Sequence, residues 1–285
     1  MKHICNAKIA ILMATYNGEK FLREQVDSLH AQTFCDWHLY VHDDGSTDNT
    51  IQILTEYHEK YPDKITLLNY PSQGGPCLNF MSMLARIDAT YYMFCDQDDV
   101  WLPEKIEISH NEMIIREQES PEVGIVICSD LYVIDEQLSV IAPSMWNYLS
   151  IYPQYIKTFR DSGASAIATG CTMLFNQKAK DNSLPCSPFA MMHDCWICLC
   201  TLKHQGKLYG IPKQLVFYRQ HRNNSLGVGV SASQIGVSYR IRHFLKLYKY
   251  NVTYYKMLSA LKYGSISKYL ASKIRYRWRI KRGYY

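Results

Sequence analysis

Four short apolar runs, each followed by polar residues and then by a segment with helical spacing, most constrain the fold of this chain. The runs are residues 8–14 (KIAILMA), 37–42 (WHLYVH), 65–68 and 91–95 (YYMFC). The segments between them are residues 19–31, residues from 46 or 47 to about 61, and a helix opened by Gly74-Gly75-Pro76. Strands joined by single helices form βαβ units, which give a parallel sheet with right-handed crossovers. We therefore predict an α/β fold with a mostly parallel central sheet and flanking helices.

The later part of the chain predicts further elements and an appended segment. Residues 123–128, 131–134 and 164–175 have the composition of strands, and residues 194–202 that of a helix. From about residue 233 the chain becomes basic and aromatic, with apolar side chains at helical spacing. We therefore expect one large domain over residues 1–232 and a basic, aromatic, helical C-terminal segment over residues 233–285.

The charge is divided along the chain. The net charge of +5 is the sum of −13 for residues 1–194 and +18 for residues 195–285, because no Asp or Glu follows Asp194. No apolar run approaches the roughly 18 residues that a membrane-spanning helix needs, and residues 9–14 are too short for a secretory signal. Ten cysteines without such a signal favour free thiols in a reducing cytosol. We expect a cytoplasmic protein.

Acidic residues follow two of the predicted strands, at the sheet edge where ligands bind in such folds. In Asp96-Gln97-Asp98-Asp99, two carboxylates two positions apart can converge on one divalent cation, leaving positions for diphosphate oxygens. The alternative is an acidic turn before a helix. In the stretch 43–48 (DDGSTD), an Asp at the strand end can accept a hydrogen bond from the imide N–H of uracil or thymine, and the alternative is likewise a capping turn.

These motifs, in their order, resemble family 2 glycosyltransferases, which have the GT-A fold. The matching stretches are ATYNG (14–18), DDGSTD (43–48), FCDQDDVWLPEK (94–105), TGCTMLFN (169–176), His193-Asp194 and YRQH (218–221). The resemblance covers about residues 7–225, and CDQDDVWLPEK with YRQH is most similar to the bacterial rhamnosyltransferase-like branch. The Gln-x-x-Arg-Trp element of processive members is absent, so processive polymerisation is not expected.

The resemblance implies a role for each matching residue. Around the nucleotide-sugar donor it places Thr15, Tyr16, Asn17, Asp44, Asp96, Gln97 and Arg219. Asp98 would hold Mg²⁺ or Mn²⁺ against the donor diphosphate, and His221 is a candidate ligand of that cation or of the diphosphate. The acceptor would be bordered by Gly170, Cys171, His193 and Trp196, and Asp194 would be the catalytic base.

The chemistry of Asp194 supports the same role. It precedes the apolar stretch Cys195 to Leu199, so it would lie at a helix N-terminus, where an anion is favoured, while burial would raise its pKa. Such a carboxylate can deprotonate an acceptor hydroxyl as it attacks the anomeric carbon, which inverts that centre. The alternative is a carboxylate that only caps the helix.

The basic, aromatic tail admits several partners. Residues 239–285 hold 13 Lys or Arg, ten Tyr and no acid. Such a segment could bind nucleic acid, lie on an anionic membrane, form a dimer contact, cover the acidic domain, or be a solvated helix. Given the resemblance, we favour peripheral contact with the inner face of the cell membrane and expect no nucleic-acid partner.

The function predicted is that of an inverting, metal-dependent glycosyltransferase of bacterial surface-polysaccharide (O-antigen or capsule) biosynthesis. The branch that the sequence resembles implies dTDP-rhamnose as the donor. A UDP-hexose is the alternative, since thymine and uracil present the same N–H. The acceptor is expected to be a glycan or a lipid-diphosphate-linked glycan. One alternative is a metal-dependent nucleotidyltransferase, although the first loop, Thr15 to Gly18, offers no Lys or Arg for a triphosphate. The other is a non-catalytic nucleotide- or glycan-binding protein.

Overall fold

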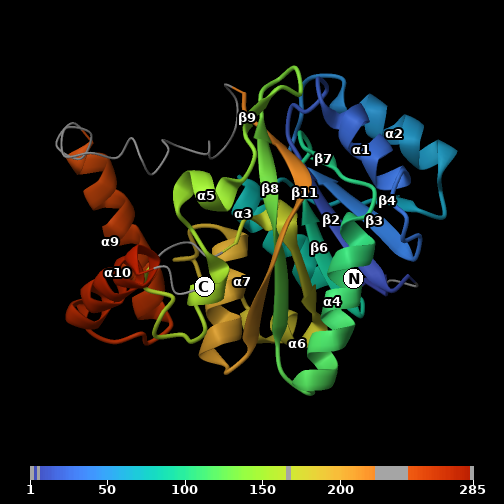
Figure 1. Ribbon diagram of the computed structural model, residues 1–285. Coiled ribbons are helices and arrows are strands. Elements are labelled where there is room, and N and C mark those ends of the chain that lie inside the picture. Colours follow the sequence, from blue (N-terminus) through green and yellow to red (C-terminus); the bar gives the residue numbers. More distant parts are fainter. Residues whose placement is uncertain (1–2, 5–6, 165–167, 222–242, 283–285) are drawn as a thin grey trace.

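A twisted nine-stranded sheet with helices on both faces forms the body of the protein (Figure 1). The computed structural model describes residues 3–4, 7–164, 168–221 and 243–282. Along the sheet the order is β4 (Ile65–Leu67), β3 (Trp37–Asp43), β2 (Ile9–Thr15), β6 (Tyr91–Cys95), β10 (Met173–Asn176), β8 (Ile125–Ile134), β11 (Lys207–Arg219) and β7 (Val100–Trp101), with β9 (Val140–Ala142) paired to β8. A separate two-stranded pair joins β1 (His3–Ile4) to β5 (Ile87–Asp88).

Side chains that alternate along β2 build two cores, one on each face of the sheet. Ala10 and Leu12 pack with α3 (Pro76–Arg86) and α7 (His193–Lys203). Ile9, Ile11 and Met13 pack on the other face with α1 (Leu22–His30), α2 (Thr50–Lys60) and α4 (Lys105–Glu119). Successive side chains of a strand point to opposite faces of the sheet, so a strand that is buried on both faces needs apolar side chains at every position. The α/β architecture is therefore as predicted.

The sheet is parallel in its first half and mixed beyond it. β4, β3, β2 and β6 are parallel neighbours, as the βαβ pattern predicts. β10 then inserts antiparallel between β6 and β8 and is followed by α6 (Gln177–Ser183), whereas β11 runs parallel to β8. The carboxyl ends of β2, β3 and β6 thus meet at one edge of the sheet.

Several predicted elements differ from those observed. The two strands expected at 123–128 and 131–134 form one strand, β8. The strand expected at 164–175 is shorter: the short 3-10 helix Gly170–Thr172 precedes β10, and residues 165–167 lie outside the described residues. Ser46 and Thr47 do not cap α2, which begins after Asn49; Ser46 instead bonds Asp43 and the backbone N–H of Asn17.

The C-terminal helices α9 (Phe244–Ala260) and α10 (Ile266–Lys281) follow each other through a short turn and lie beside α5 (Met145–Leu149) and α7, at the left of Figure 1. Their tyrosines bind the chain segment that follows α5 and includes the 3-10 turn Pro153–Tyr155. Tyr254 donates to the carbonyl of Ser162 (2.7 Å), and the hydroxyl of Tyr276 accepts from the N–H of Tyr152 (2.7 Å). The helices predicted for this segment are present, and one face of the pair is fixed to the body.

The domain boundary predicted at residue 232 lies outside the described residues. Among the described helices, none has both the length and the apolar character needed to span a membrane. The nine cysteines within the described ranges are free thiols, and most of them are buried.

Candidate active site

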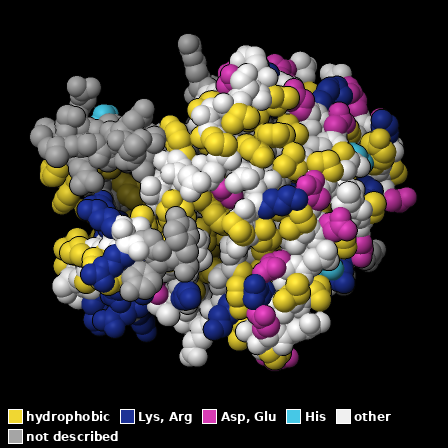
Figure 2. Space-filling model, in the orientation of Figure 1, with side chains coloured by type: hydrophobic (Ala, Val, Ile, Leu, Met, Phe, Trp, Pro, Cys, Tyr) yellow, Lys and Arg dark blue, Asp and Glu magenta, His cyan; other side chains and the backbone are white. Residues whose placement is uncertain are grey.

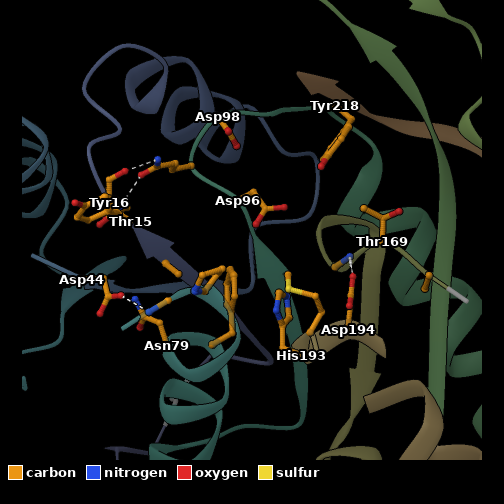
Figure 3. A pocket seen from close by; sticks show the side chains of 18 of the residues that line it. Thr15, Tyr16, Asp44, Asn79, Asp96, Asp98, Thr169, His193, Asp194 and Tyr218 are labelled. Atoms are coloured by element: carbon orange, nitrogen blue, oxygen red, sulfur yellow. Dashed lines mark hydrogen bonds between the residues drawn. The ribbon is translucent and has the colours of Figure 1, made fainter. Parts of the chain in front are cut away.

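A pocket of about 840 Å³ lies at the carboxyl ends of β2, β3 and β6 and extends to α5, α7 and α9 (Figure 3). On the strand side its lining includes Thr15, Tyr16, Asp44, Asn79, Asp96, Gln97 and Asp98. On the far side it includes Met145, Trp146, Leu149, Ile151, Thr169, Gly170, Met192, His193, Asp194, Tyr218 and Tyr250. Most of the predicted site residues therefore line one pocket, in two groups that face each other across it.

Asp44 is held as an anion by the loop that precedes α3. Its carboxylate accepts from Ser72 Oγ (2.8 Å) and from the backbone N–H groups of Gln73 (2.5 Å), Gly74 (3.4 Å) and Gly75 (2.8 Å). Burial alone would raise the pKa of Asp44, but these hydrogen bonds, led by that of Ser72, outweigh it and lower the pKa. Gly74 and Gly75 reach this arrangement with φ of +78° and +136°, which side chains disfavour. Asp44 is thus an ionised acceptor at the pocket wall.

The first loop is joined to the acidic turn through Gln97. The Gln97 amide accepts from the N–H of Tyr16 (2.9 Å) and donates to its carbonyl (3.0 Å). The Tyr16 ring is 58% exposed at the pocket edge, as a surface for stacking requires. The Thr15 hydroxyl donates a hydrogen bond to the Asp43 carboxylate (2.8 Å).

Asn17 stands apart from the other predicted donor residues. Its side chain accepts from the N–H of Thr47 (2.9 Å), with φ at +48°, and it is not among the pocket-lining residues. Asn17 therefore shapes the loop that follows β3, and its contact with the donor stays a prediction.

The two predicted metal ligands lie together. His221 Nε2 is 2.6 Å from Asp98 Oδ2, and Asp96 lies in the same wall of the pocket. Burial, followed by the negative charges of Asp98 and Asp194, raises the pKa of Asp96 to about 8. Among the described residues the pocket lining includes four aspartates and neither Lys nor Arg. A divalent cation would offset this crowding of carboxylates, and the oxygen and imidazole donors fit Mg²⁺ or Mn²⁺.

Cys171 and Asp99 lie behind the pocket wall that carries Asp96 and Asp98. Both are fully buried, and neither lines the pocket. One ligand atom each of Cys171, Asp99 and Asp96 falls within 4.8 Å of the others. The structure therefore does not place Cys171 with the other predicted acceptor residues: its thiol faces the buried carboxyl of Asp99.

Arg219 is also buried and does not line the pocket, so the structure does not bring it together with the other predicted donor residues. Its guanidinium donates to the carbonyls of Asp98 (2.8 Å) and Glu136 (2.9 Å) and to the Glu24 carboxylate (2.5 Å). The same group stacks over the Phe21 ring at 4.4 Å. Arg219 thus fixes the backbone that carries Asp98.

We predict that Arg219→Met lowers the free energy of unfolding by about 2–4 kcal/mol, because carbonyls that it satisfies lose their donors. Urea denaturation measures the change. Lys213→Met is the matched control: its exposed ion pair with Glu104 should contribute less than about 1 kcal/mol. Equal stability of the two variants would contradict the buried role of Arg219.

Asp194 lies in the first turn of α7, on the opposite wall from Asp44. Its carboxylate accepts from the N–H groups of Gly170 (3.1 Å) and Cys195 (2.5 Å). Burial raises the pKa of Asp194 to about 6, although these two hydrogen bonds pull it downward. A carboxylate with this pKa is ionised at neutral pH and basic enough to take a proton from a hydroxyl.

His193 and Gly170 pack against each other beside Asp194. A side chain at Gly170 would place its Cβ 2.7 Å from His193 Nε2, so only glycine fits there. The imidazole lies 4.1 Å from the Phe80 ring and 4.6 Å from the Phe94 ring. Burial lowers the pKa of His193 to about 3, and the ring is therefore neutral.

Trp196, which was predicted to border the acceptor, is a core residue and does not line the pocket. Its indole N–H donates to the carbonyl of Ser183 (2.8 Å), and the side chain is buried among α6 and α7. The pocket wall beside Asp194 includes residues of α5, Tyr218 and Tyr250 of α9. Strand alternation could have identified Tyr218 as a pocket residue. Neighbouring side chains of a strand face opposite sides of the sheet, so Tyr218 and Arg219 point in opposite directions.

The chain is similar to known glycosyltransferases in sequence. Residues 10–183 match the sequence model of glycosyl transferase family 2. The dTDP-rhamnosyl transferase RfbG of Shigella flexneri is 27% identical over 239 residues, which are 77% of this chain and 75% of that protein. WfgD of Escherichia coli, a UDP-Glc:alpha-D-GlcNAc-diphosphoundecaprenol beta-1,3-glucosyltransferase, is 29% identical over 106 residues, 37% of this chain and 41% of WfgD.

Two solved structures show the same fold. The mannosyltransferase PcManGT of Pyrobaculum calidifontis, in complex with GDP-Man and Mn²⁺, superposes with a TM-score of 0.59 at 14% identity over 96% of this chain and 70% of its own. TarS 1–349 of Staphylococcus aureus gives a TM-score of 0.53 at 20% identity over 74% of this chain. This chain covers 60% of that TarS fragment.

Proposed function

Because this chain belongs to glycosyl transferase family 2 and has the GT-A fold that its sequence predicts, we propose that it transfers one sugar, with inversion, from a nucleoside diphosphate to a glycan hydroxyl in bacterial surface-polysaccharide synthesis. The observation that carries the proposal is the pairing, across one pocket, of an ionised acceptor for a nucleotide base, Asp44, with a half-buried carboxylate of pKa about 6, Asp194.

Asp194 is the proposed base. The acceptor hydroxyl loses its proton to the Asp194 carboxylate while its oxygen bonds to the anomeric carbon of the donor. The bond from that carbon to the diphosphate oxygen breaks at the same time, and the nucleoside diphosphate leaves with the electron pair. A single displacement of this kind inverts the anomeric centre. The Gly170 N–H orients the carboxylate for the transfer.

Asp98 and His221, with Asp96 beside them, are the residues that would hold Mg²⁺ or Mn²⁺. Such a cation supplies charge neutralisation for the departing diphosphate. Because no Lys or Arg lines the described part of the pocket, an anionic donor has no other source of positive charge among those lining residues. The Mn²⁺ in the PcManGT complex supports the same expectation by analogy of fold.

The donor is proposed to be dTDP-rhamnose, with a UDP-hexose as the alternative. Asp44 would accept the imide N–H that thymine and uracil share, and the exposed Tyr16 ring would stack on the base. RfbG, a dTDP-rhamnosyl transferase, supports the first donor, and WfgD, which uses UDP-Glc, supports the second.

The acceptor is proposed to be a glycan on a lipid diphosphate, presented at the inner face of the cell membrane. The far wall of the pocket is apolar and aromatic, with Met145, Trp146, Leu149 and Tyr250. Aromatic rings suit the apolar faces of sugar units, and the acceptor of WfgD is a sugar on a diphosphoundecaprenol.

A donor panel tests the proposal. With Mn²⁺ present, dTDP-rhamnose or a UDP-hexose should raise the melting temperature of the protein by several degrees, whereas CDP- and ADP-sugars, which lack the imide N–H, should not. Asp44→Asn, which keeps the size of the side chain, should remove the discrimination. Stabilisation by none of the dTDP- or UDP-sugars, or an equal response to all nucleotides, would overturn the proposal.

A further inference from the structure

We propose that the outer face of α10 is a docking surface for an anionic lipid bilayer. The inference extends the proposed function, because it names the surface on which a lipid-linked acceptor would be reached. It rests on an exposed apolar stripe, on the charge around that stripe, and on the rigid attachment of the helix to the body.

The stripe consists of side chains four residues apart on α10. Ile266, Leu270 and Ile274 are 59%, 52% and 71% exposed, and Trp278 continues the series at 48%. Side chains at this spacing lie on one face of a helix. Large apolar side chains exposed singly are ordinary, but a continuous row of them marks an interaction site.

The opposite face of α10 is fixed to the body of the protein. Tyr269 donates to Asn251 of α9 (2.7 Å), Ser272 to the carbonyl of Asp161 (3.1 Å), and Arg279 to that of Tyr155 (2.8 Å). The helix therefore uses one face for packing and turns its apolar stripe outward. A helix whose only role was to cover the acidic domain would need no second apolar face.

The charge around the stripe selects an anionic partner. Residues 244–282 contain 11 Lys or Arg and no acidic residue. Among the exposed ones on α10 are Lys268, Arg277 and Lys281. Dark blue side chains gather with yellow ones over α9 and α10 at the lower left of Figure 2, whereas magenta carboxylates are spread over the body. Each basic side chain near an anionic bilayer adds about fivefold to binding.

A bilayer fits this surface better than nucleic acid does. Phosphate contacts alone would need basic side chains without an apolar row, and isoleucine and leucine offer nothing to a duplex backbone. A helix that lies in a membrane interface combines the two: apolar side chains enter the acyl boundary, and Lys, Arg and Trp stay at the headgroups.

The docking surface is linked to the pocket through α9. Tyr250 of α9 lines the pocket, and the next residue, Asn251, accepts the hydrogen bond from Tyr269 of α10. The helix that bears the apolar stripe is therefore bound next to a residue of the pocket lining.

Flotation of the purified full chain with vesicles tests the proposal. The wild-type protein should float with vesicles of 30% phosphatidylglycerol in phosphatidylcholine and remain in the dense fraction with phosphatidylcholine alone. Ile266→Ser/Leu270→Ser/Ile274→Ser should weaken binding at least tenfold, and Lys268→Glu/Arg277→Glu/Lys281→Glu about 100-fold. The matched controls, which alter equally exposed side chains on the body, are Ile115→Ser/Val140→Ser/Ile141→Ser and Lys60→Glu/Lys178→Glu/Lys207→Glu, and these should float like the wild type.

Two results would overturn the docking surface: equal flotation of the α10 variants and their controls, or binding of a DNA duplex by the wild type with no flotation on either vesicle. Donor-induced stabilisation is measured on the same variants. If the α10 variants lose flotation and keep that stabilisation, the docking surface stands and the pocket is intact. If the wild type floats but no donor stabilises it, the docking surface stands and only the proposed function fails.

Discussion

Asp194→Asn should lower kcat for sugar transfer about 1,000-fold and leave donor binding within twofold of the wild type. The asparagine keeps the size of the side chain but cannot accept the proton of the attacking hydroxyl. General-base catalysis contributes a rate factor of this order. Initial rates of nucleoside diphosphate release, with acceptor present and absent, measure kcat, and calorimetric titration with donor and Mn²⁺ measures binding.

The pH dependence of kcat is a second test of the role of Asp194. Because burial raises the pKa of Asp194 to about 6, the base form is lost as the pH falls through 6, and wild-type kcat should fall about tenfold for each unit below that. The residual rate of Asp194→Asn should lack this limb. Asp63→Asn, an exposed carboxylate on the body, is the matched control and should retain both the rate and the limb. A variant at Asp194 that keeps a tenth of the activity would exclude it as the base.

Asp98→Asn should raise the Mn²⁺ concentration needed for half-maximal activity about 100-fold. Asp98 supplies a charged oxygen next to His221 Nε2, and the amide that replaces it is a neutral and weaker ligand for a hard cation. Donor affinity measured at low Mn²⁺ should fall with it, because the described lining of the pocket includes no Lys or Arg to attract the diphosphate.

His221→Gln should give a smaller shift, about tenfold, because the carboxylate remains. The control is Asp135→Asn, in a turn that follows β8 and outside the pocket lining, whose Mn²⁺ dependence should be that of the wild type. Full activity of Asp98→Asn in the presence of EDTA would show that no cation acts at this site.

The first half of the fold could be predicted because each of its strands is a local run of buried residues. Residues 91–95 form β6 with the bounds that the sequence predicts, and β2 and β3 differ from their predictions by one or two residues. The polar ends of these strands meet at one edge for topological reasons, so the sequence alone was enough to group Asp44, Asp96 and Asp98.

The second half could not be predicted in the same way. β11 is exposed or half-buried along much of its length, and its apolar run, residues 215–218, is confined to its last third, so its pairing with β8 defines most of it as a strand. Motif matching alone cannot tell which side chains face a ligand: Arg219, Cys171 and Trp196 belong to matching stretches or adjoin them, yet all three point into the protein. Tyr250 reaches the pocket from a helix that no local signal connects with the strand ends.

The most direct test of the account is transfer itself. The wild-type protein, Mn²⁺, dTDP-rhamnose or a UDP-hexose, and a disaccharide on a lipid diphosphate should give an acceptor heavier by one sugar unit in mass spectrometry, with inverted anomeric configuration in the NMR spectrum. The same mixture with Asp194→Asn should give unmodified acceptor. Retained configuration, or equal product from the wild type and Asp194→Asn, would contradict the account.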